Sequence, residues 1–229
     1  MADDFKATIS VVPDRGRVTW DSEGTEGGFF HSRKPKVPSD ASGVTIGRGY
    51  DMSAKLPGKI IGDLTAAGVP KEMAEKLSQA AGLVGADAEK YLTDNKLSDV
   101  EITVVAQKSL FEITYRDEAA EAKRLASKQD VVAKYGKCDW DKLDPAIEQM
   151  LVDLKFRGDY TGGARALIQS AVVANDLEAF AKAMSEKSNW PNVPKDRFDR
   201  RVRFLDDALA DKKFKDKLVK QAPGAKPGP

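Results

Sequence analysis

The chain has one cysteine, Cys138, and one histidine, His31. A single cysteine cannot form an intramolecular disulfide, and the two residues together are too few for a structural zinc site, which needs several such ligands. A Ser-His-Asp triad would have to use His31. Acid–base chemistry in this protein therefore falls mainly to carboxylates.

The chain also lacks long apolar runs and a surplus of charge. Its longest apolar runs, such as residues 80–85, are far shorter than the ~18 residues that a membrane span needs. The 37 Lys and Arg residues nearly balance the 36 Asp and Glu residues, whereas a nucleic-acid-binding domain usually has a clear basic surplus. Residues 1–5 are acidic and lack the basic region and apolar stretch of a secretory signal. We expect no membrane span, no nucleic-acid partner and no signal peptide.

The 229 residues divide into two regions of different composition. Residues 13–58 are rich in Gly, Pro, Ser and Asp and include a β-prone piece at 44–46, whereas helical periodicity begins near residue 59. We predict an α+β fold, mostly α, as one domain over 16–220, with a small β-containing lobe at about 16–58 and a helical lobe at about 59–220. A cleft is expected between the lobes, because ligand sites favour such junctions. Residues 1–15 are predicted to form an N-terminal arm and 221–229 a disordered tail.

Apolar residues at helical spacing predict the core of the helical lobe, and they fall at 147, 150, 151 and 154, at 177, 180, 181 and 184, and at 198, 202, 205 and 209. Capping-box patterns at 98–101 and 175–178 mark helix starts. The first predicts one long helix, although Val100, Ile102 and Val104 alternate as in a strand. Along the last helix, an amphipathic pattern favours a solvated basic face made of Arg197, Arg200, Arg201 and Arg203.

The front region holds five carboxylates within 31 residues, namely Asp21, Glu23, Glu26, Asp40 and Asp51. Glu23 and Glu26 are each followed by glycine, and residues 45–51 place a hydroxyl and a carboxylate beside glycines that let the backbone approach a ligand closely. Two carboxylates across a cleft suit glycosidic cleavage, since one protonates the leaving oxygen while the other orients water or attacks the sugar carbon.

The front region also resembles a known family. Ser22-Glu23-Gly24, followed about twenty residues later by Ser42-Gly43-Val44-Thr45-Ile46-Gly47-Arg48-Gly49-Tyr50-Asp51-Met52, is similar to the active-site segment of phage-type lysozymes, especially the pesticin-like branch. The resemblance extends more loosely to 156–160 and to 190–201, and it covers about 20–209. It implies a lysozyme-like fold.

Transferred position by position, the resemblance implies that Glu23 is the general acid, Thr45 the hydroxyl that helps position water, and Asp51 the second carboxylate. Asp40 is the alternative second carboxylate, because the better-known phage branch places its aspartate a few residues before the threonine. Glu26 is the alternative acid. We prefer Glu23 and Asp51 because their contexts and spacings to Thr45 fit the pesticin-like pattern better.

The resemblance also implies supporting residues around these candidates. Arg197 matches the family's arginine that forms a salt bridge with the catalytic glutamate. Tyr50 and His31 are the candidates for binding substrate. No metal or organic cofactor is expected, because side chains and water can transfer the protons and stabilise the charge.

The family implies a muramidase that cleaves the β-1,4 bond between N-acetylmuramic acid and N-acetylglucosamine in bacterial peptidoglycan. The alternatives are a non-catalytic peptidoglycan-binding module on the same fold and a lytic transglycosylase. We expect a monomer that is made in the cytoplasm and acts on the wall in the periplasm, either as a phage endolysin released by a holin or as an effector delivered by a secretion system. An effector would be expected to have a cognate periplasmic immunity protein.

Overall fold

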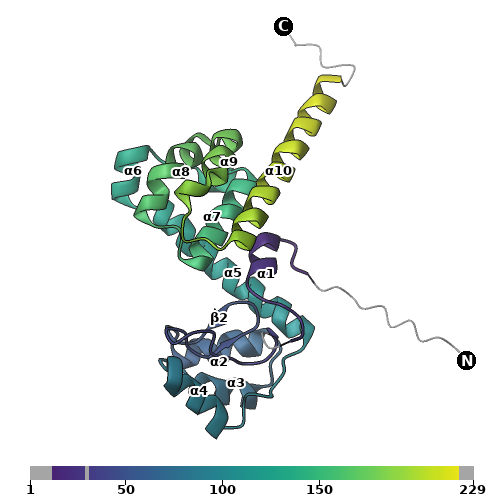
Figure 1. Cartoon of the computed structure of the whole chain (residues 1–229), viewed down its shortest axis with the longest axis vertical. Coiled ribbons are helices and arrows are strands. Elements are labelled where there is room, and N and C mark those ends of the chain that lie inside the picture. Colours follow the sequence, from purple (N-terminus) through teal and green to yellow (C-terminus); the bar gives the residue numbers. More distant parts are fainter. Residues whose placement is uncertain (1–11, 29–30, 222–229) are drawn as a thin grey trace, which may run out of the picture. The chain divides into compact units, whose positions relative to one another are not determined.

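A computed structural model describes residues 12–28 and 31–221 of the chain (Figure 1). Most of the predicted arm at 1–15 and of the predicted tail at 221–229 lies outside these residues, and Gln221 is the last residue of a helix. The chain separates into two compact units, residues 1–117 and 118–229. The boundary falls inside a long helix, and the lobe boundary expected near residue 58 falls inside the first unit.

In the first unit, one short helix precedes a two-stranded antiparallel hairpin and three further helices. The elements are α1 (Arg17–Ser22), β1 (Thr45–Ile46), β2 (Tyr50–Asp51), α2 (Pro57–Ala66), α3 (Lys71–Ser78), α4 (Gly85–Asp94) and the first part of α5 (Val104–Ala126). The second unit holds the rest of α5, α6 (Gln129–Tyr135), η1 (Trp140–Lys142), α7 (Pro145–Arg157), α8 (Gly162–Ala174), α9 (Leu177–Ser185), η2 (Lys187–Asn189) and α10 (Lys195–Gln221). The predicted α+β class, mostly α, is confirmed.

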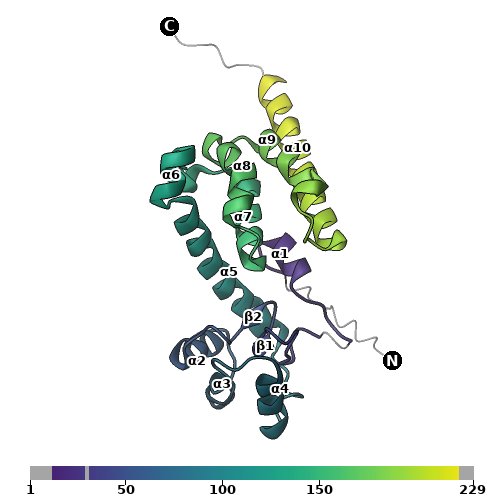
Figure 2. The ribbon, with the colours of Figure 1, turned by 60° about the vertical axis from the view of Figure 1, so that its left-hand side comes forward.

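The hairpin of the first unit is anchored by its apolar side chains. Ile46 lies opposite Tyr50 in the register, and both are buried in a core that also takes side chains from α2, α3, α4 and α5. Because successive strand residues face opposite sides, the neighbours Thr45 and Asp51 face away from this core. The three helices α2, α3 and α4 gather around the hairpin (Figures 1 and 2).

The long helix begins later than the capping-box pattern predicts. Residues 98–103 are not helical, and α5 starts at Val104. The backbone N–H of Ile102 donates to the carbonyl of Arg33 at 3.0 Å, and the Arg33 guanidinium donates to the carbonyl of Ile102 at 3.2 Å. These bonds hold the segment extended, and the hydroxyl of Thr103 accepts the N–H of Ala106 at 3.0 Å as the actual cap. The predicted start at Ser98 is therefore wrong.

The cap assignment can be tested by paired substitutions. Thr103→Ala is expected to lower the free energy of unfolding by about 1 kcal/mol, because it leaves a helix N–H without its partner. Ser98→Ala is expected to change it by less than about 0.5 kcal/mol. Urea denaturation followed by circular dichroism measures both, and a larger loss at Ser98 would contradict the assignment.

In the second unit, α7 lies among α8, α9 and α10 (Figure 2). The predicted core positions on α7 and α9 are confirmed as buried, and those on α10 are buried or half-buried. The α9 start near 175–178 is also confirmed, although Asp176 caps the helix and Asn175, with φ 52°, ends α8 instead.

A cluster of charged residues around Asp153 is buried inside this unit. Asp153 on α7 is 0% exposed, and its two oxygens accept hydrogen bonds from Arg197 at 2.7 Å and from Arg201 at 2.6 Å. Arg201 also forms an ion pair with Asp159 at 2.9 Å. A buried carboxylate is tolerated only with such partners.

The predicted solvated basic face on the last helix is therefore wrong for two of its four arginines. Arg197 and Arg201 are buried because Asp153 requires their charges, whereas Arg203 is exposed and Arg200 is half-buried. Burial raises the pKa of Asp153, but the charges and hydrogen bonds of Arg201 and Arg197 outweigh it and hold that pKa below the ordinary 3.8.

Asp153→Asn is expected to lower the free energy of unfolding by about 3–5 kcal/mol at neutral pH, because two buried arginines lose their counter-charge. The pKa of Asp153 is lower in the folded state, so its contribution is complete above the unfolded-state pKa and is lost as pH falls through the folded-state pKa. The gap between wild type and variant should therefore shrink below about pH 4. Denaturation at several pH values measures this.

The exposed Asp206 on the same helix as the arginines provides the control. Asp206→Asn is expected to change the free energy of unfolding by less than about 0.5 kcal/mol. A similar loss for both variants, or a gap independent of pH, would contradict a buried charge cluster.

Candidate active site

Thr45 and Asp51 lie directly opposite each other in the hairpin. Side chains at such opposed positions have Cβ atoms about 4.5–5.5 Å apart and share one face of the sheet. Thr45 is 7% exposed and Asp51 is half-buried. The structure therefore brings the predicted hydroxyl and the preferred second carboxylate together.

Gly43 holds both of these residues through its backbone. Its carbonyl accepts the Thr45 hydroxyl at 3.2 Å, and its N–H donates to Asp51 Oδ2 at 3.2 Å. The other oxygen of Asp51 accepts the N–H of Ser53 at 2.7 Å. A Cβ at position 43 would lie 2.8 Å from Asp51 Oδ1, so only glycine allows this approach. The bonds fix the carboxylate's orientation and leave each oxygen able to accept another hydrogen bond.

Lys36 lies next to Thr45 on the side away from Asp51, so the three residues form a row across adjacent chain segments. Lys36 and Thr45 exchange both backbone hydrogen bonds, at 2.9 and 2.8 Å, in an antiparallel bridge. Lys36, Thr45 and Asp51 therefore occupy opposed positions on three adjacent chain segments. Opposed positions share a face, which here carries an ammonium, a hydroxyl and a carboxylate in order.

Glu23, the preferred acid, caps the C-terminal end of α1, where its N–H donates to the carbonyl of Thr19 at 2.9 Å. It is half-buried. The carbonyls of Trp20 and Gly24, on either side of it, both accept hydrogen bonds from Arg48, at 2.7 and 2.5 Å. Arg48 comes from the turn between β1 and β2, so the turn of the hairpin fixes the segment that carries Glu23.

The geometry of the turn depends on its two glycines. Gly47 has φ 63° and Gly49 has φ 82°, conformations that side-chain-bearing residues rarely adopt. They place the buried Arg48 over the ring of Trp20, with 4.1 Å between the guanidinium carbon and the ring centre. The guanidinium is thus held by a cation–π contact as well as by its hydrogen bonds.

Glycine is required at position 24 because the backbone there lies close to Ser32 in the next loop. A Cβ at position 24 would lie 2.0 Å from the hydroxyl of Ser32, which itself donates to the carbonyl of Thr25 at 3.0 Å. The glycine after Glu23 therefore has a packing function.

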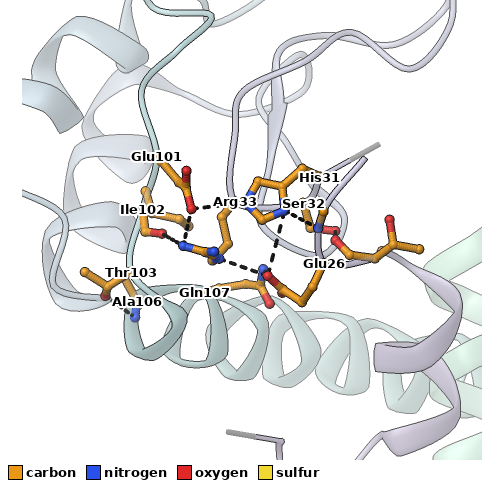
Figure 3. A network of polar contacts seen from close by, with 12 residues as sticks. Glu26, His31, Ser32, Arg33, Glu101, Ile102, Thr103, Ala106 and Gln107 are labelled. Atoms are coloured by element: carbon orange, nitrogen blue, oxygen red, sulfur yellow. Dashed lines mark hydrogen bonds and ion pairs between the residues drawn. The ribbon is translucent and has the colours of Figure 1, made fainter. Parts of the chain in front are cut away.

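Glu26, the alternative acid, belongs to a network of charges (Figure 3). Its carboxylate accepts hydrogen bonds from Arg33 Nε at 2.9 Å and Gln107 Nε2 at 2.9 Å, and lies 3.5 Å from Arg48 Nη2. Burial raises the pKa of Glu26, but the bonds from Arg33 and Gln107 and the charges of Arg33 and Arg48 outweigh burial and lower it. A general acid needs the opposite shift.

His31 lies in the same network and has its two ring nitrogens bound. Nδ1 accepts the N–H of Gly27 at 2.7 Å, and Nε2 lies 3.1 Å from Glu101. Arg33 stands between Glu26 and Glu101 and pairs with both (Figure 3). The bond from Gly27 matches the neutral imidazole that carries its proton on Nε2.

Two other predicted residues lie elsewhere. Asp40 is exposed in a turn that packs near the start of α4, where the carbonyl of Ser42 accepts the N–H of Gly85 at 2.9 Å. Tyr50 is 1% exposed, and its hydroxyl donates to Asp63 at 2.9 Å. The ring of Tyr50 thus belongs to the core, and its predicted part in binding substrate stays a prediction.

Arg197 lies in the second unit and bonds to Asp153 there. The pairing with Glu23 that the resemblance implies stays a prediction.

The sequence reasoning missed Arg48, Arg33, Gln107 and Lys36. For Arg48 a signal existed, because an arginine between two glycines indicates a tight turn, and a tight turn fixes the direction of the side chain. Arg33, Gln107 and Lys36 gave none, since single polar residues are usually solvated.

Within 12–28 and 31–221, no group of three or more His, Cys, Asp or Glu side chains is arranged to hold a metal ion. No helix in the described part of the chain is long and apolar enough to cross a membrane.

Residues 16–202 match a family described as a domain of unknown function, DUF8812. No curated protein matches the chain.

The anchoring role of Arg48 leads to a prediction. Lysine has no planar fork of donors, so Arg48→Lys is expected to release the carbonyls of Trp20 and Gly24 and to lower the free energy of unfolding by about 1.5–3 kcal/mol. Amides of 17–24 should exchange faster with solvent, as measured by hydrogen exchange.

The control is Arg17→Lys in α1, where an exposed arginine pairs with Asp21. It should leave exchange nearly unchanged, because exposed pairs contribute little. Unchanged protection of 17–24 in Arg48→Lys would contradict the anchoring role.

Proposed function

The chain belongs to the DUF8812 family, and we propose that it is a muramidase that hydrolyses the β-1,4 bond between N-acetylmuramic acid and N-acetylglucosamine in bacterial peptidoglycan. The observation that supports this most is the organisation of the hairpin. Thr45 and Asp51 stand opposite each other on it, and Arg48 in its turn binds the carbonyls on both sides of Glu23.

Glu23 is the proposed general acid, which protonates the glycosidic oxygen as the bond to the sugar breaks. It is half-buried, in a segment whose carbonyls on both sides of it are held by Arg48. Its rival Glu26 accepts bonds from Arg33 and Gln107, and its lowered pKa keeps it ionised. Two glutamates three residues apart are thus assigned different parts, Glu23 in proton transfer and Glu26 in structure.

Thr45 and Asp51 are proposed to act on the water. The Thr45 hydroxyl donates a hydrogen bond to the carbonyl of Gly43, so its oxygen can accept a hydrogen bond from water. Asp51 is oriented by the N–H groups of Gly43 and Ser53. It can act as the base that removes a proton from that water, or it can stabilise positive charge on the sugar. Asp40 is not opposed to Thr45 and is assigned no part.

The assignment is tested by clearing of purified peptidoglycan suspensions. Glu23→Gln is expected to lower the rate by about 10²–10⁴-fold, because general acid catalysis contributes that much. Asp51→Asn and Thr45→Val should lower it substantially as well. Glu75→Gln, an exposed glutamate on α3, is the matched control and should leave the rate unchanged.

The products and the variants separate this proposal from its rivals. Hydrolysis adds one water to each released muropeptide, whereas a lytic transglycosylase leaves an anhydro-muramic end, and mass spectrometry distinguishes the two. Binding of peptidoglycan without clearing would overturn the enzymatic assignment in favour of a binding module. Loss of clearing in Asp40→Asn but not in Asp51→Asn would transfer the second carboxylate to Asp40.

A further inference from the structure

The first unit contains a cavity of about 370 Å³ beside the hairpin. One wall is a continuous segment, residues 34–38, and another is formed by α4 through Glu89, Leu92 and Thr93. Its volume lies within the range of small-ligand sites, which is roughly 300–1,000 Å³. Pro35 and Pro38 restrict the backbone of the first wall, so that wall is organised before any ligand arrives.

The segment wall is basic. Lys34 and Lys36 both line the cavity. Burial first, and then the charge of Arg48, lower the pKa of Lys36. Lys34 pairs at 3.2 Å with Asp99, which is 97% exposed, and such an exposed pair contributes little and is easily exchanged.

The helix wall has the opposite character. Glu89 supplies one carboxylate, Leu92 an apolar surface, and Thr93 a hydroxyl that donates to the carbonyl of Glu89 at 3.0 Å. A cavity lined by lysines on one wall and by a glutamate on another is complementary to a small group that carries both charges. A simple anion would leave Glu89 without a favourable contact.

The cavity also adjoins the proposed catalytic residues. Lys36, in its wall, exchanges both backbone hydrogen bonds with Thr45. A ligand held there would lie one chain segment away from the row of Thr45 and Asp51. In peptidoglycan, the group attached next to the cleaved bond is the peptide stem of N-acetylmuramic acid.

We propose that this cavity binds the zwitterionic end of a diamino acid in the peptide stem, with its carboxylate at Lys34 and its ammonium at Glu89. The assignment rests on the proposed muramidase function for the identity of the substrate. It makes the peptide, and not only the glycan, a determinant of which wall material the protein takes.

The test uses a free stem tripeptide, L-Ala-γ-D-Glu-meso-diaminopimelate, and the same peptide with its side-chain carboxylate amidated. Titration into the full chain carrying Glu23→Gln is followed by amide NMR. Shifts are expected at 34–38 and 89–93, and amidation should weaken binding by roughly tenfold, the loss typical of one charged hydrogen bond. Lys34→Gln and Glu89→Gln should each weaken binding of the intact peptide to a similar extent.

Combining the amidated peptide with the protein variants shows which side chain binds which group of the peptide. If Lys34 holds the side-chain carboxylate, amidation should weaken binding to Lys34→Gln much less than binding to the parent chain, because the two changes remove one interaction. Lys90→Gln is the control, since Lys90 lies on α4 next to Glu89, is exposed, pairs with Asp94 and does not line the cavity.

Equal affinity for both peptides, or equal affinity in all variants, would overturn the assignment. Failure here is distinguishable from failure of the proposed function, because the peptide contains no sugar. Clearing of peptidoglycan without peptide binding would overturn the cavity assignment alone, whereas saturable, charge-dependent peptide binding without clearing would support the cavity and overturn the muramidase.

Discussion

The candidate site depends on the guanidinium of Arg48. It donates to the carbonyls of Trp20 and Gly24, stacks on the Trp20 ring, donates to Gln107 on α5 and lies near Glu26. The first helix, the hairpin turn and the long helix therefore meet at one buried cation. An arginine suits this place because its fixed fork of donors reaches several acceptors at once and stays charged when buried.

The sequence predicted the elements whose signals are local. Helical periodicity predicted the buried residues of α7 and α9, and the β-prone piece at 44–46 predicted a strand where β1 lies. The start of α5 was mispredicted because the bonds between Ile102 and Arg33 join residues about seventy positions apart. A capping pattern consists of residues that are adjacent in the sequence, so it contains no information about a contact with a distant residue.

The charged residues show the same division. Asp153 stands among the apolar residues of α7, and a carboxylate in that setting indicates that opposite charge must be buried with it. The partner arginines lie more than forty positions away, where periodicity favoured a solvated face. For the candidate site, Thr45 and Asp51 were named from a motif, whereas the contacts of Glu26 with Arg33 and with the distant Gln107 have no local signal in the sequence.

Gly43 has no side chain, yet it bonds to both Thr45 and Asp51. The hydroxyl and the carboxylate are therefore both held by the backbone of one residue, through bonds that involve no neighbouring side chain. Related chains could change the residues around this pair widely and keep the pair intact, provided position 43 stays glycine. A sequence comparison that considers only acidic, basic and nucleophilic residues would overlook Gly43, which holds both Thr45 and Asp51.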